Sequence, residues 1–292
     1  MTHERDSMVL AVDGGGTRCR LALDWCDGRV SIEVGSANVS SDFNAATTEI
    51  SNGLKQLSEE SGIEMGELCG LPSHLALAGV TGPDLAGRVA DALPLSRAEV
   101  QDDRLAALYG ALGEADGAIA HCGTGSFLAL RKNGNIRLAG GWGPRLGDEA
   151  SAQWIGRRAL SSALDAVDGI GAESSLTQSI LSSFKTPAEV VAFAATASPA
   201  QVGQYAQTVT DHAGSGDGVA REILRAGAHE IFERLGKMGW SSKLPLCLTG
   251  GMGHVYGDYL PSEASAAITA PIGKPIDGAV ALARRFGKEL AA

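Results

Sequence analysis

Two glycine–threonine turns, each directly after an apolar segment, are the residues of this chain best suited to chemistry. Asp13-Gly14-Gly15-Gly16-Thr17 follows residues 8–12, and Cys122-Gly123-Thr124-Gly125-Ser126 comes after residues 117–120. Glycine lets backbone N–H groups approach a ligand with no Cβ in the way, and each threonine adds a hydroxyl donor. A concave set of such donors binds anions, phosphate above all. Two turns, one in each half of the chain, predict a phosphate group held from two sides.

Three aspartates lie where strands are expected to end. Asp13 could hold Mg²⁺ beside a phosphate, directly or through water, or could only stabilise its own turn. Asp102 and Asp103 follow an expected short strand and precede a helix. There a carboxylate can take the proton of a substrate hydroxyl during phosphoryl transfer, or can cap the helix. We favour Asp102 as the base and expect Asp103 to face away.

A glycine-rich segment in the second half combines an indole with two acids. Trp142 is flanked by Gly140, Gly141 and Gly143, and Asp148 and Glu149 follow. The indole could be a platform for the apolar face of a sugar, or could pack in the core. We expect the two acids to open a helix, where they suit its dipole, and one of them to accept hydrogen bonds from substrate hydroxyls.

A third glycine turn, Thr249-Gly250-Gly251-Met252-Gly253, follows another apolar segment. It could approach a ribose or an adenine, or could be only a turn. Other familiar sites are missing from the sequence. No helix is expected after Gly16, so the first turn is not a dinucleotide fingerprint, and no P-loop pattern occurs. Zinc-like histidine groups and a serine nucleophile elbow are also absent.

The expected elements repeat. Strands at residues 8–13, 20–24 and 30–35 precede a helix, a strand at 75–79, a helix at 86–93, a strand at 98–101 and a helix at 105–112. The order restarts with strands at 118–122, 126–132 and 136–139, joined by a turn at Asn133-Gly134. Alternation of this kind favours an α/β fold. We expect one domain at residues 1–113 and another at 114–277, with a helical insert at about 148–238. A terminal helix at about 278–292 could pack on the first domain.

Composition limits the classes of function. The net charge of −10 argues against nucleic-acid partners, which need a basic surface. The five cysteines form no C-x-x-C pair, which argues against a disulfide framework or zinc site. The start, Met1 to Asp6, is polar, and no apolar run is long enough to span a membrane. We therefore expect a soluble cytoplasmic protein without membrane partners.

The three glycine turns occur in the order of the two phosphate motifs and the adenosine motif of the sugar kinase, actin and heat-shock ATPase superfamily. Within it, the chain resembles the N-acetylglucosamine kinase family, which includes bacterial glucosamine kinases and is of the BadF/BadG/BcrA/BcrD type. The most specific parts are residues 13–20, Gly35-Ser36-Ala37-Asn38, and residues 140–156. The resemblance implies two ribonuclease H-like (actin-like ATPase) domains facing a nucleotide cleft, and a homodimer.

The resemblance also implies roles for single residues. Asp13 would position Mg²⁺, and Asp102 would be the base on the sugar's 6-hydroxyl. The remaining roles are phosphate contact (Gly15, Gly16, Thr17, Thr124, Gly125), adenosine contact (Gly250, Gly251) and sugar contact (Asn38, Gly141, Trp142, Asp148). One departure is Asp103, because the residue after the family's catalytic aspartate is usually small.

The implied function is that of an ATP- and Mg²⁺-dependent amino-sugar kinase. The sequence does not separate glucosamine from N-acetylglucosamine or another hexosamine. Two alternatives stay open. One is an ATPase of the dehydratase-activator type, although the sequence offers no convincing pair of cysteines for an iron–sulfur cluster. The other is a catalytically silent sugar or nucleotide sensor, although both Asp13 and Asp102 are present.

Overall fold

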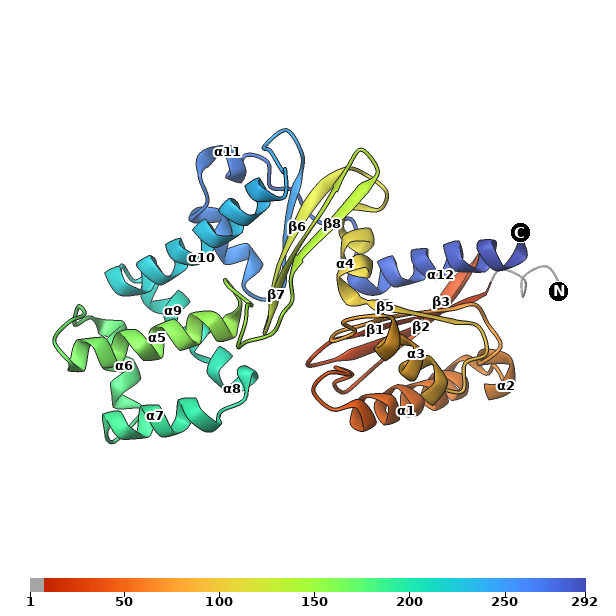
Figure 1. Ribbon diagram of the computed structural model, residues 1–292, viewed down its shortest axis with the longest axis horizontal. Helices are drawn as coiled ribbons and strands as arrows, with labels where there is room; N and C mark the ends of the chain where they lie inside the picture. The colour runs from red at the N-terminus through yellow and green to blue at the C-terminus, as the bar shows by residue number, and fades with distance from the viewer. Residues whose placement is uncertain (1–7) are drawn as a thin grey trace. The chain divides into compact units, whose positions relative to one another are not determined.

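The computed structural model describes residues 8–292 and divides into two compact units (Figure 1). Unit 1 takes in Met1–Ala115 and Pro271–Ala292, and unit 2 takes in Asp116–Ala270. The sequence prediction placed these boundaries at 113/114 and 277/278. The polar start discussed above, Met1 to Asp6, lies outside the described residues.

Unit 1 contains a five-stranded mixed sheet in the order β3-β2-β1-β4-β5. Its strands are β1 (Val9–Gly14), β2 (Cys19–Trp25), β3 (Gly28–Val34), β4 (Ser73–Leu77) and β5 (Ala98–Asp102). The first three form an antiparallel meander, whereas β1, β4 and β5 run parallel. Every residue of β1 and β4 is buried, as expected for central strands that are covered on both faces.

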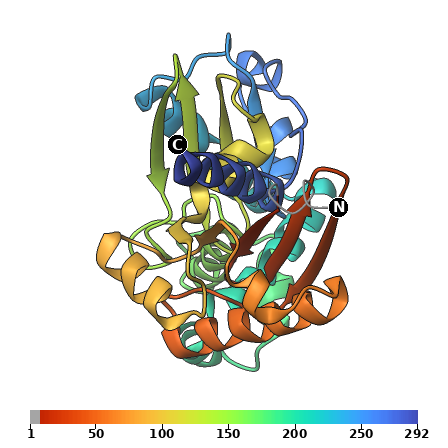
Figure 2. The same ribbon diagram turned by 90° about the vertical axis from the view of Figure 1, so that its right-hand side faces the viewer.

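Helices cover both faces of this sheet (Figures 1 and 2). On one face lie α1 (Phe43–Ser61), α2 (Met65–Leu68) and α3 (Pro83–Ala92); on the other lie α4 (Asp103–Leu112) and α12 (Pro275–Ala291). The period-two alternation of β1 separates two cores, because Leu10 and Val12 pack with the α1 side while Val9 and Ala11 pack with α12. The C-terminal helix is therefore an integral layer of unit 1.

Helices α4 and α12 pack unusually closely through two glycines. A Cβ on Gly278 would collide with the carbonyl oxygen of Ala106, and a Cβ on Gly110 would collide with that of Lys274. Backbone therefore packs directly on backbone at this crossing. Because α4 begins at the Asp102–Asp103 pair, the crossing fixes the helix that carries these acids.

Unit 2 contains a four-stranded sheet in the order β8-β7-β6-β9. Its strands are β6 (Gly117–Cys122), β7 (Ser126–Lys132), β8 (Asn135–Gly140) and β9 (Leu246–Thr249). The first three are antiparallel and β9 runs parallel to β6, which repeats the arrangement of β1 to β4. The predicted turn is confirmed: Asn133 and Gly134 have φ of 52° and 76°. Two positive φ values are the signature of a type I′ hairpin.

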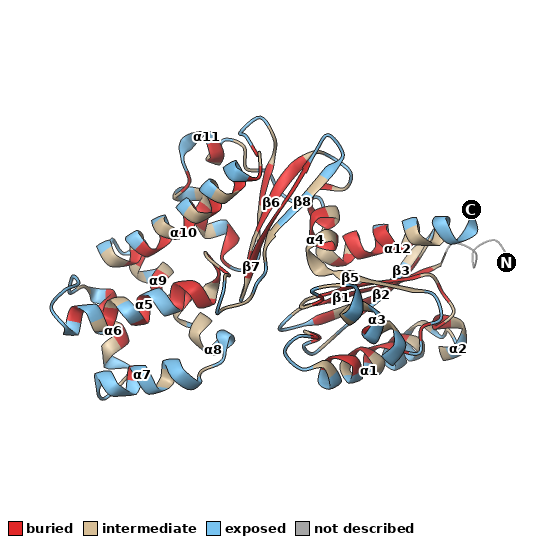
Figure 3. Ribbon diagram, in the orientation of Figure 1, coloured by how far each residue is buried: buried red, intermediate tan, exposed pale blue. Residues whose placement is uncertain are grey.

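The predicted helical insert is present in unit 2. It comprises α5 (Ala152–Val167), α6 (Ser175–Ser182), α7 (Pro187–Thr196), α8 (Pro199–Gly203), α9 (Tyr205–Gly214) and α10 (Gly218–Lys237), and η2 (Gly253–Asp258) and α11 (Ser262–Ser265) follow β9. Helix α10 buries the predicted stripe (Ala220, Ile223, Gly227, Ile231, Leu235) against the shared core of unit 2. Figure 3 shows that buried residues alternate with exposed ones along α10.

Several element boundaries differ from the prediction, and proline explains two of them. Helix α3 begins at Pro83 instead of residue 86, and α12 begins at Pro275 instead of about residue 278. Proline suits the first helical turn, because it lacks the N–H that would stay unsatisfied there. Strand β4 lies two residues earlier than expected, because Ser73 and His74 are buried polar strand residues and Gly79 has turned into the left-handed region. None of the helices in residues 8–292 is both long and apolar enough to cross a bilayer.

The close helix crossing gives a stability prediction. Gly278→Ala should lower the free energy of unfolding by about 1–3 kcal/mol, because the new methyl group forces α12 away from α4. Urea unfolding followed by far-UV circular dichroism measures this. Gly87→Ala in α3 is the matched control, since nothing lies within 4 Å of its Cβ position. That variant should be neutral or more stable by up to about 1 kcal/mol; equal losses in both variants would contradict the close-packing argument.

Candidate active site

Parallel pairing in unit 1 brings the candidate acids to one edge of the sheet. Gly14 pairs with Leu77, and Leu77 pairs with Asp102. The carboxyl ends of β1, β4 and β5 are therefore level, and Asp102 lies roughly 10 Å from the end of β1, two strands away. The first glycine turn (residues 13–17) leaves this edge. Gly15 N donates to Arg18 O at 2.9 Å to close the turn, which leaves Gly16 and Thr17 exposed at its tip.

Asp13 is a buried carboxylate beside a single arginine. Arg20 Nη1 lies 3.5 Å from Asp13 Oδ2, and Arg20 Nη2 lies 3.0 Å from Glu33. Burial raises the pKa of Asp13 to about 6, which outweighs the opposing effect of Arg20. Asp13 is thus a carboxylate that a further cation would stabilise.

Asp102 and Asp103 have different environments. Asp102 is the N-cap of α4: its Oδ1 accepts from Arg104 N at 2.9 Å and from Arg104 Nε at 2.6 Å. The pKa of Asp103 is raised to about 7, first by burial and then by the charges of Asp102 and Asp13. The expectation that Asp103 faces away from the site therefore conflicts with the structure, because its carboxyl lies within the field of Asp13. The capping function falls to Asp102.

Asn38 borders the same edge through the chain that precedes α1. Ala37 N donates to Gly15 O at 3.1 Å, which ties this segment to the first glycine turn. Asn38 Oδ1 accepts from Ser40 N, Ser40 Oγ and Ser41 N at 2.9–3.2 Å. Since its oxygen is occupied, Asn38 would offer a ligand the N–H donors of its amide.

In unit 2 the second glycine turn (residues 122–126) and the third (residues 249–253) lie side by side. Met252 N donates to Cys122 O at 2.8 Å. Gly250 has a φ of 79°, and a Cβ there would collide with Cys122 O. Only glycine fits this approach, because it needs both the left-handed backbone and the missing side chain. Thr124, Gly250 and Gly251 are exposed on the resulting surface.

His121 joins these two turns and was missed at the sequence level. Its Nδ1 lies 3.1 Å from Thr249 Oγ1, and its ring stacks on Phe127 at 4.9 Å between centroids. Burial lowers the pKa of His121 to about 4, so the ring is neutral near pH 7. The available signal was a polar residue on an apolar strand directly before a glycine turn.

The segment of residues 140–147, the tryptophan loop, begins where β8 ends. Gly140, Gly141 and Gly143 all have φ between 75° and 83°, and Gly141 N donates to Ser126 O at 2.9 Å. Trp142 is 64 % exposed and therefore does not pack in the core of unit 2. The loop presents an indole to solvent beside the second glycine turn.

Asp148 and Glu149 point to different partners. The buried Asp148 carboxylate accepts from the backbone N–H groups of Ser126 and Gly143, and burial raises its pKa. Glu149 Oε1 instead lies 2.7 Å from Arg234 Nη2. The prediction that both acids open a helix is wrong, because α5 begins later, with Ser151 as its N-cap. Asp148 is the acid that lies against the second glycine turn, since its carboxyl contacts the Cβ position of Gly125.

The acids of unit 1 fit a hydrated Mg²⁺ ion better than a metal ion that is coordinated by protein side chains alone. Among residues 8–292 no group of three histidine, cysteine or acidic side chains could hold a metal ion. Mg²⁺ usually binds through one or two carboxylates, with phosphate oxygens and water as its other ligands. The poorly compensated charge of Asp13 fits that pattern.

The predicted residues thus gather in two groups. Unit 1 brings together Asp13, the first glycine turn, Asn38 and the acid pair. Unit 2 brings together the second and third glycine turns, Gly141 and Asp148, with Trp142 beside them. The profile of one protein family, described as the BadF/BadG/BcrA/BcrD ATPase family, matches residues 10–281.

The chain belongs to the BadF/BadG/BcrA/BcrD ATPase family.

Relatives extend over nearly the full chain. A glucosamine kinase of Vibrio cholerae is 29 % identical over 94 % of this chain and 95 % of its own length. An N-acetylmuramic acid/N-acetylglucosamine kinase of Clostridium acetobutylicum is 26 % identical over 77 % and 76 %. A solved structure from Chromobacterium violaceum, provisionally named an N-acetylglucosamine kinase, superposes with a TM-score of 0.84 at 29 % identity and covers 95 % of this chain and 99 % of that one. The predicted family resemblance and α/β, actin-like ATPase fold class are confirmed.

The link between the two turns of unit 2 gives a prediction for this ATPase family member. His121→Phe keeps the stack on Phe127 but loses the bond to Thr249, so it should weaken ADP binding about five- to tenfold. Isothermal titration calorimetry measures the affinity. Thr249→Val removes the same bond from the other side, and the double variant should lose no more than either single one. Unchanged ADP affinity in both single variants would refute the link.

Proposed function

We propose that this protein is an ATP-dependent amino-sugar kinase that transfers the γ-phosphate to the 6-hydroxyl of glucosamine or N-acetylglucosamine. The observation that carries the proposal is the acid pair at the β5–α4 junction. The Asp102 carboxylate caps α4. The pKa of its neighbour Asp103 is raised, in part by the charge of Asp13. A base of this kind beside a phosphate-type glycine turn suits phosphoryl transfer to an alcohol. The names of the two bacterial relatives support an amino sugar as the acceptor.

The glycine turns supply the nucleotide contacts in this proposal. Gly15, Gly16 and Thr17 in unit 1, and Thr124 and Gly125 in unit 2, would hold the phosphates. Gly250 and Gly251 would border the adenosine. Asp13 would hold Mg²⁺ directly or through water, and that ion would neutralise charge on the transferred phosphoryl group. Exposed N–H and hydroxyl donors at the tips of these turns support these roles.

The sugar would be held by side chains that can each act only as a hydrogen-bond donor or only as an acceptor. Asn38 can offer only its amide N–H groups, because its oxygen is satisfied by Ser40 and Ser41. Asp148 would accept hydrogen bonds from the ring hydroxyls, and the backbone of Gly141 would contact the sugar ring. The exposed indole of Trp142 would cover the apolar face of the sugar.

For the general base, the geometry supports Asp103 over the predicted Asp102. The Asp102 carboxylate is already occupied, because it caps α4 and accepts two hydrogen bonds from Arg104. Asp103, with a pKa of about 7, is poised to take a proton near neutral pH. It would accept the proton of the 6-hydroxyl while that oxygen bonds to phosphorus and the bond from phosphorus to the ADP oxygen breaks.

Two asparagine variants separate the pair. Asp103→Asn should lower kcat by roughly 10²–10⁴-fold and leave sugar affinity within a few-fold, because only proton transfer is lost. Asp102→Asn should keep most activity, since asparagine also caps helices well. Coupled ADP release measures kcat, and calorimetry measures sugar affinity. A more severe loss in Asp102→Asn would return the base assignment to Asp102.

Stability provides the control for this pair. A carboxyl whose pKa rises on folding costs stability as pH increases from about 4 to 7, and the full cost is present above pH 7. Asp103→Asn removes this cost and should therefore raise Tm at pH 8 while activity falls. A lower Tm would mean that the lost activity reflects damaged folding.

The acceptor is identified by ATP consumption against a panel of hexoses and hexosamines, with a control lacking sugar. A strong signal with one amino sugar and little without it supports the kinase and names its substrate. Equal ATP hydrolysis with and without sugar would contradict the kinase proposal and indicate an ATPase that energises a partner. ATP binding without turnover would replace it by a sensor. A cytoplasmic location and a homodimer are part of the same proposal, and analytical ultracentrifugation tests the dimer.

A further inference from the structure

The segment from Asp148 to Ala150 is held in a backbone conformation that its residues do not favour. Asp148 has a φ of 61° and Ala150 a φ of 66°, and Ala150 is completely buried. Aspartate tolerates the left-handed region, but for alanine it is unfavourable and persists only where the surroundings enforce it. The contacts that enforce it are therefore functional parts of any site that uses Asp148.

Backbone atoms of the segment are fixed at two points. Ser126 Oγ donates to Glu149 O at 2.6 Å, and Tyr256 Oη donates to Ala150 O at 2.8 Å. Both donors belong to structures already built around the nucleotide turns, since Ser126 ends the second glycine turn. These bonds fix the two carbonyl groups but leave the side chain of Glu149 to another partner.

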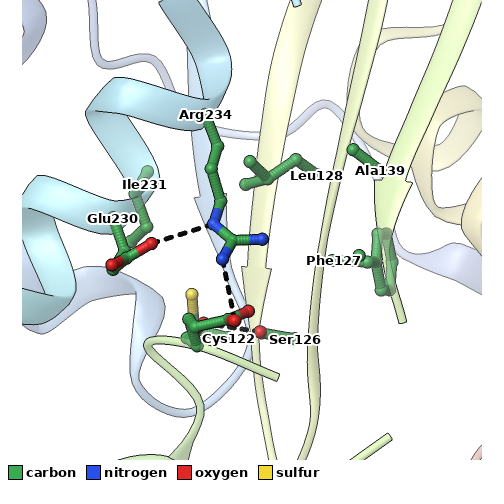
Figure 4. Close-up of a pocket in the computed structure, with 10 residues that line it drawn as sticks. Cys122, Ser126, Phe127, Leu128, Ala139, Glu230, Ile231 and Arg234 are labelled. Atoms are coloured by element: carbon green, nitrogen blue, oxygen red, sulfur yellow. Dashed lines mark hydrogen bonds and ion pairs between the residues drawn. The ribbon is translucent and has the colours of Figure 1, made fainter. Parts of the chain in front are cut away.

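That partner comes from α10, more than eighty residues further along the chain. Arg234 Nη2 lies 2.7 Å from Glu149 Oε1, and Arg234 Nε lies 2.9 Å from Glu230 Oε2 on the same helix. Figure 4 shows Arg234 reaching from α10 toward Cys122 and Ser126, with Glu230 beside its guanidinium. Glu230 thus steadies the guanidinium, while Glu149 is its contact with the left-handed segment.

The position of Glu149 lets this ion pair influence Asp148 and, through Asp148, the tryptophan loop. On one side of the segment Asp148 receives N–H bonds from Ser126 in the second glycine turn and from Gly143 in the tryptophan loop. On the other side Glu149 faces a narrow pocket lined by Ser126, Phe127, Ile231 and Arg234. Pulling Glu149 out of place would rotate Asp148 away from its two N–H donors.

We propose that Arg234, through Glu149, is a positioning residue that sets the orientation of Asp148 and of the tryptophan loop for the amino sugar. This rests on the proposed function. The pair is partly exposed, with side-chain exposures of 40 % for Arg234 and 25 % for Glu149. Ion pairs of this exposure add little to global stability. The ion pair between Arg234 and Glu149 therefore affects the orientation of Asp148 more than the free energy of unfolding.

The test compares Arg234→Met, Glu149→Met and the double variant. Methionine keeps much of the apolar stem of arginine while removing the charge. Arg234→Met should raise the KM for the amino sugar about tenfold and change the KM for ATP by less than about threefold, with Tm nearly unchanged. The smaller ATP effect is expected because the bond from Met252 N to Cys122 O, which joins the second and third glycine turns, involves neither Arg234 nor Glu149. The double variant should be no worse than the more damaged single one.

Glu230→Gln is the matched control, because it neutralises the other carboxylate that pairs with Arg234 and does not touch the left-handed segment. It should stay within about twofold of the wild type in both KM values. Equal KM changes for sugar and ATP in Arg234→Met, or effects in the double variant that multiply, would overturn the proposal.

A second measurement is independent of catalysis. Arg145 and Leu146 lie exposed in the tryptophan loop, so trypsin can cut between them. Release of Glu149 should accelerate that cut in Arg234→Met but not in Glu230→Gln, because a loosened loop opens more often. An unchanged rate in Arg234→Met refutes the positioning role. If no amino sugar is phosphorylated by the wild type while the cut is accelerated, the kinase assignment fails and the loop constraint stands.

Discussion

The parallel register of β1, β4 and β5 is the constraint on which the candidate site of unit 1 depends. Because Gly14, Leu77 and Asp102 lie in one row, the carboxyl ends of these strands form a level edge. The acids at that edge gain their altered pKa values from this placement and from burial. A slip of one residue would turn every side chain of a strand to the other face. The buried cores on both faces of β1 therefore fix the chemistry as well as the fold.

Concentrated negative charge is costly, and the structure offsets only part of it. Arg20 is shared between Asp13 and Glu33, and Arg104 is engaged by Asp102. Asp103 is left with the largest uncompensated cost. A group held in an unfavourable state by its surroundings is typical of functional sites, where stability is exchanged for reactivity. Unit 2 also contains an unfavourable feature beside its candidate site, because Ala150 has a left-handed backbone conformation that costs stability.

Much of the fold could be predicted because its signals are local. Three-strand meanders, the Asn133-Gly134 hairpin and the apolar stripe of α10 each depend on spacing within one element. The glycine turns were equally visible, since glycine runs between apolar strands have few other uses. What sequence alone could not resolve was the choice within neighbouring pairs. Asp102 and Asp103 have the same chemistry, and only the start of α4 decides which of them caps it.

The same limit explains why Glu149 and Asp148 were treated together. Adjacent acids before a helix suggest a shared role at its N-terminus. A left-handed residue on either side of Glu149 reverses the direction of successive side chains, so one acid meets the second glycine turn and the other meets Arg234. Backbone conformation of this kind has no reliable signature in a non-glycine residue. Long-range partners such as Arg234 and His121 are hidden for a related reason: their importance comes from contacts with residues far away in the sequence, which local patterns do not record.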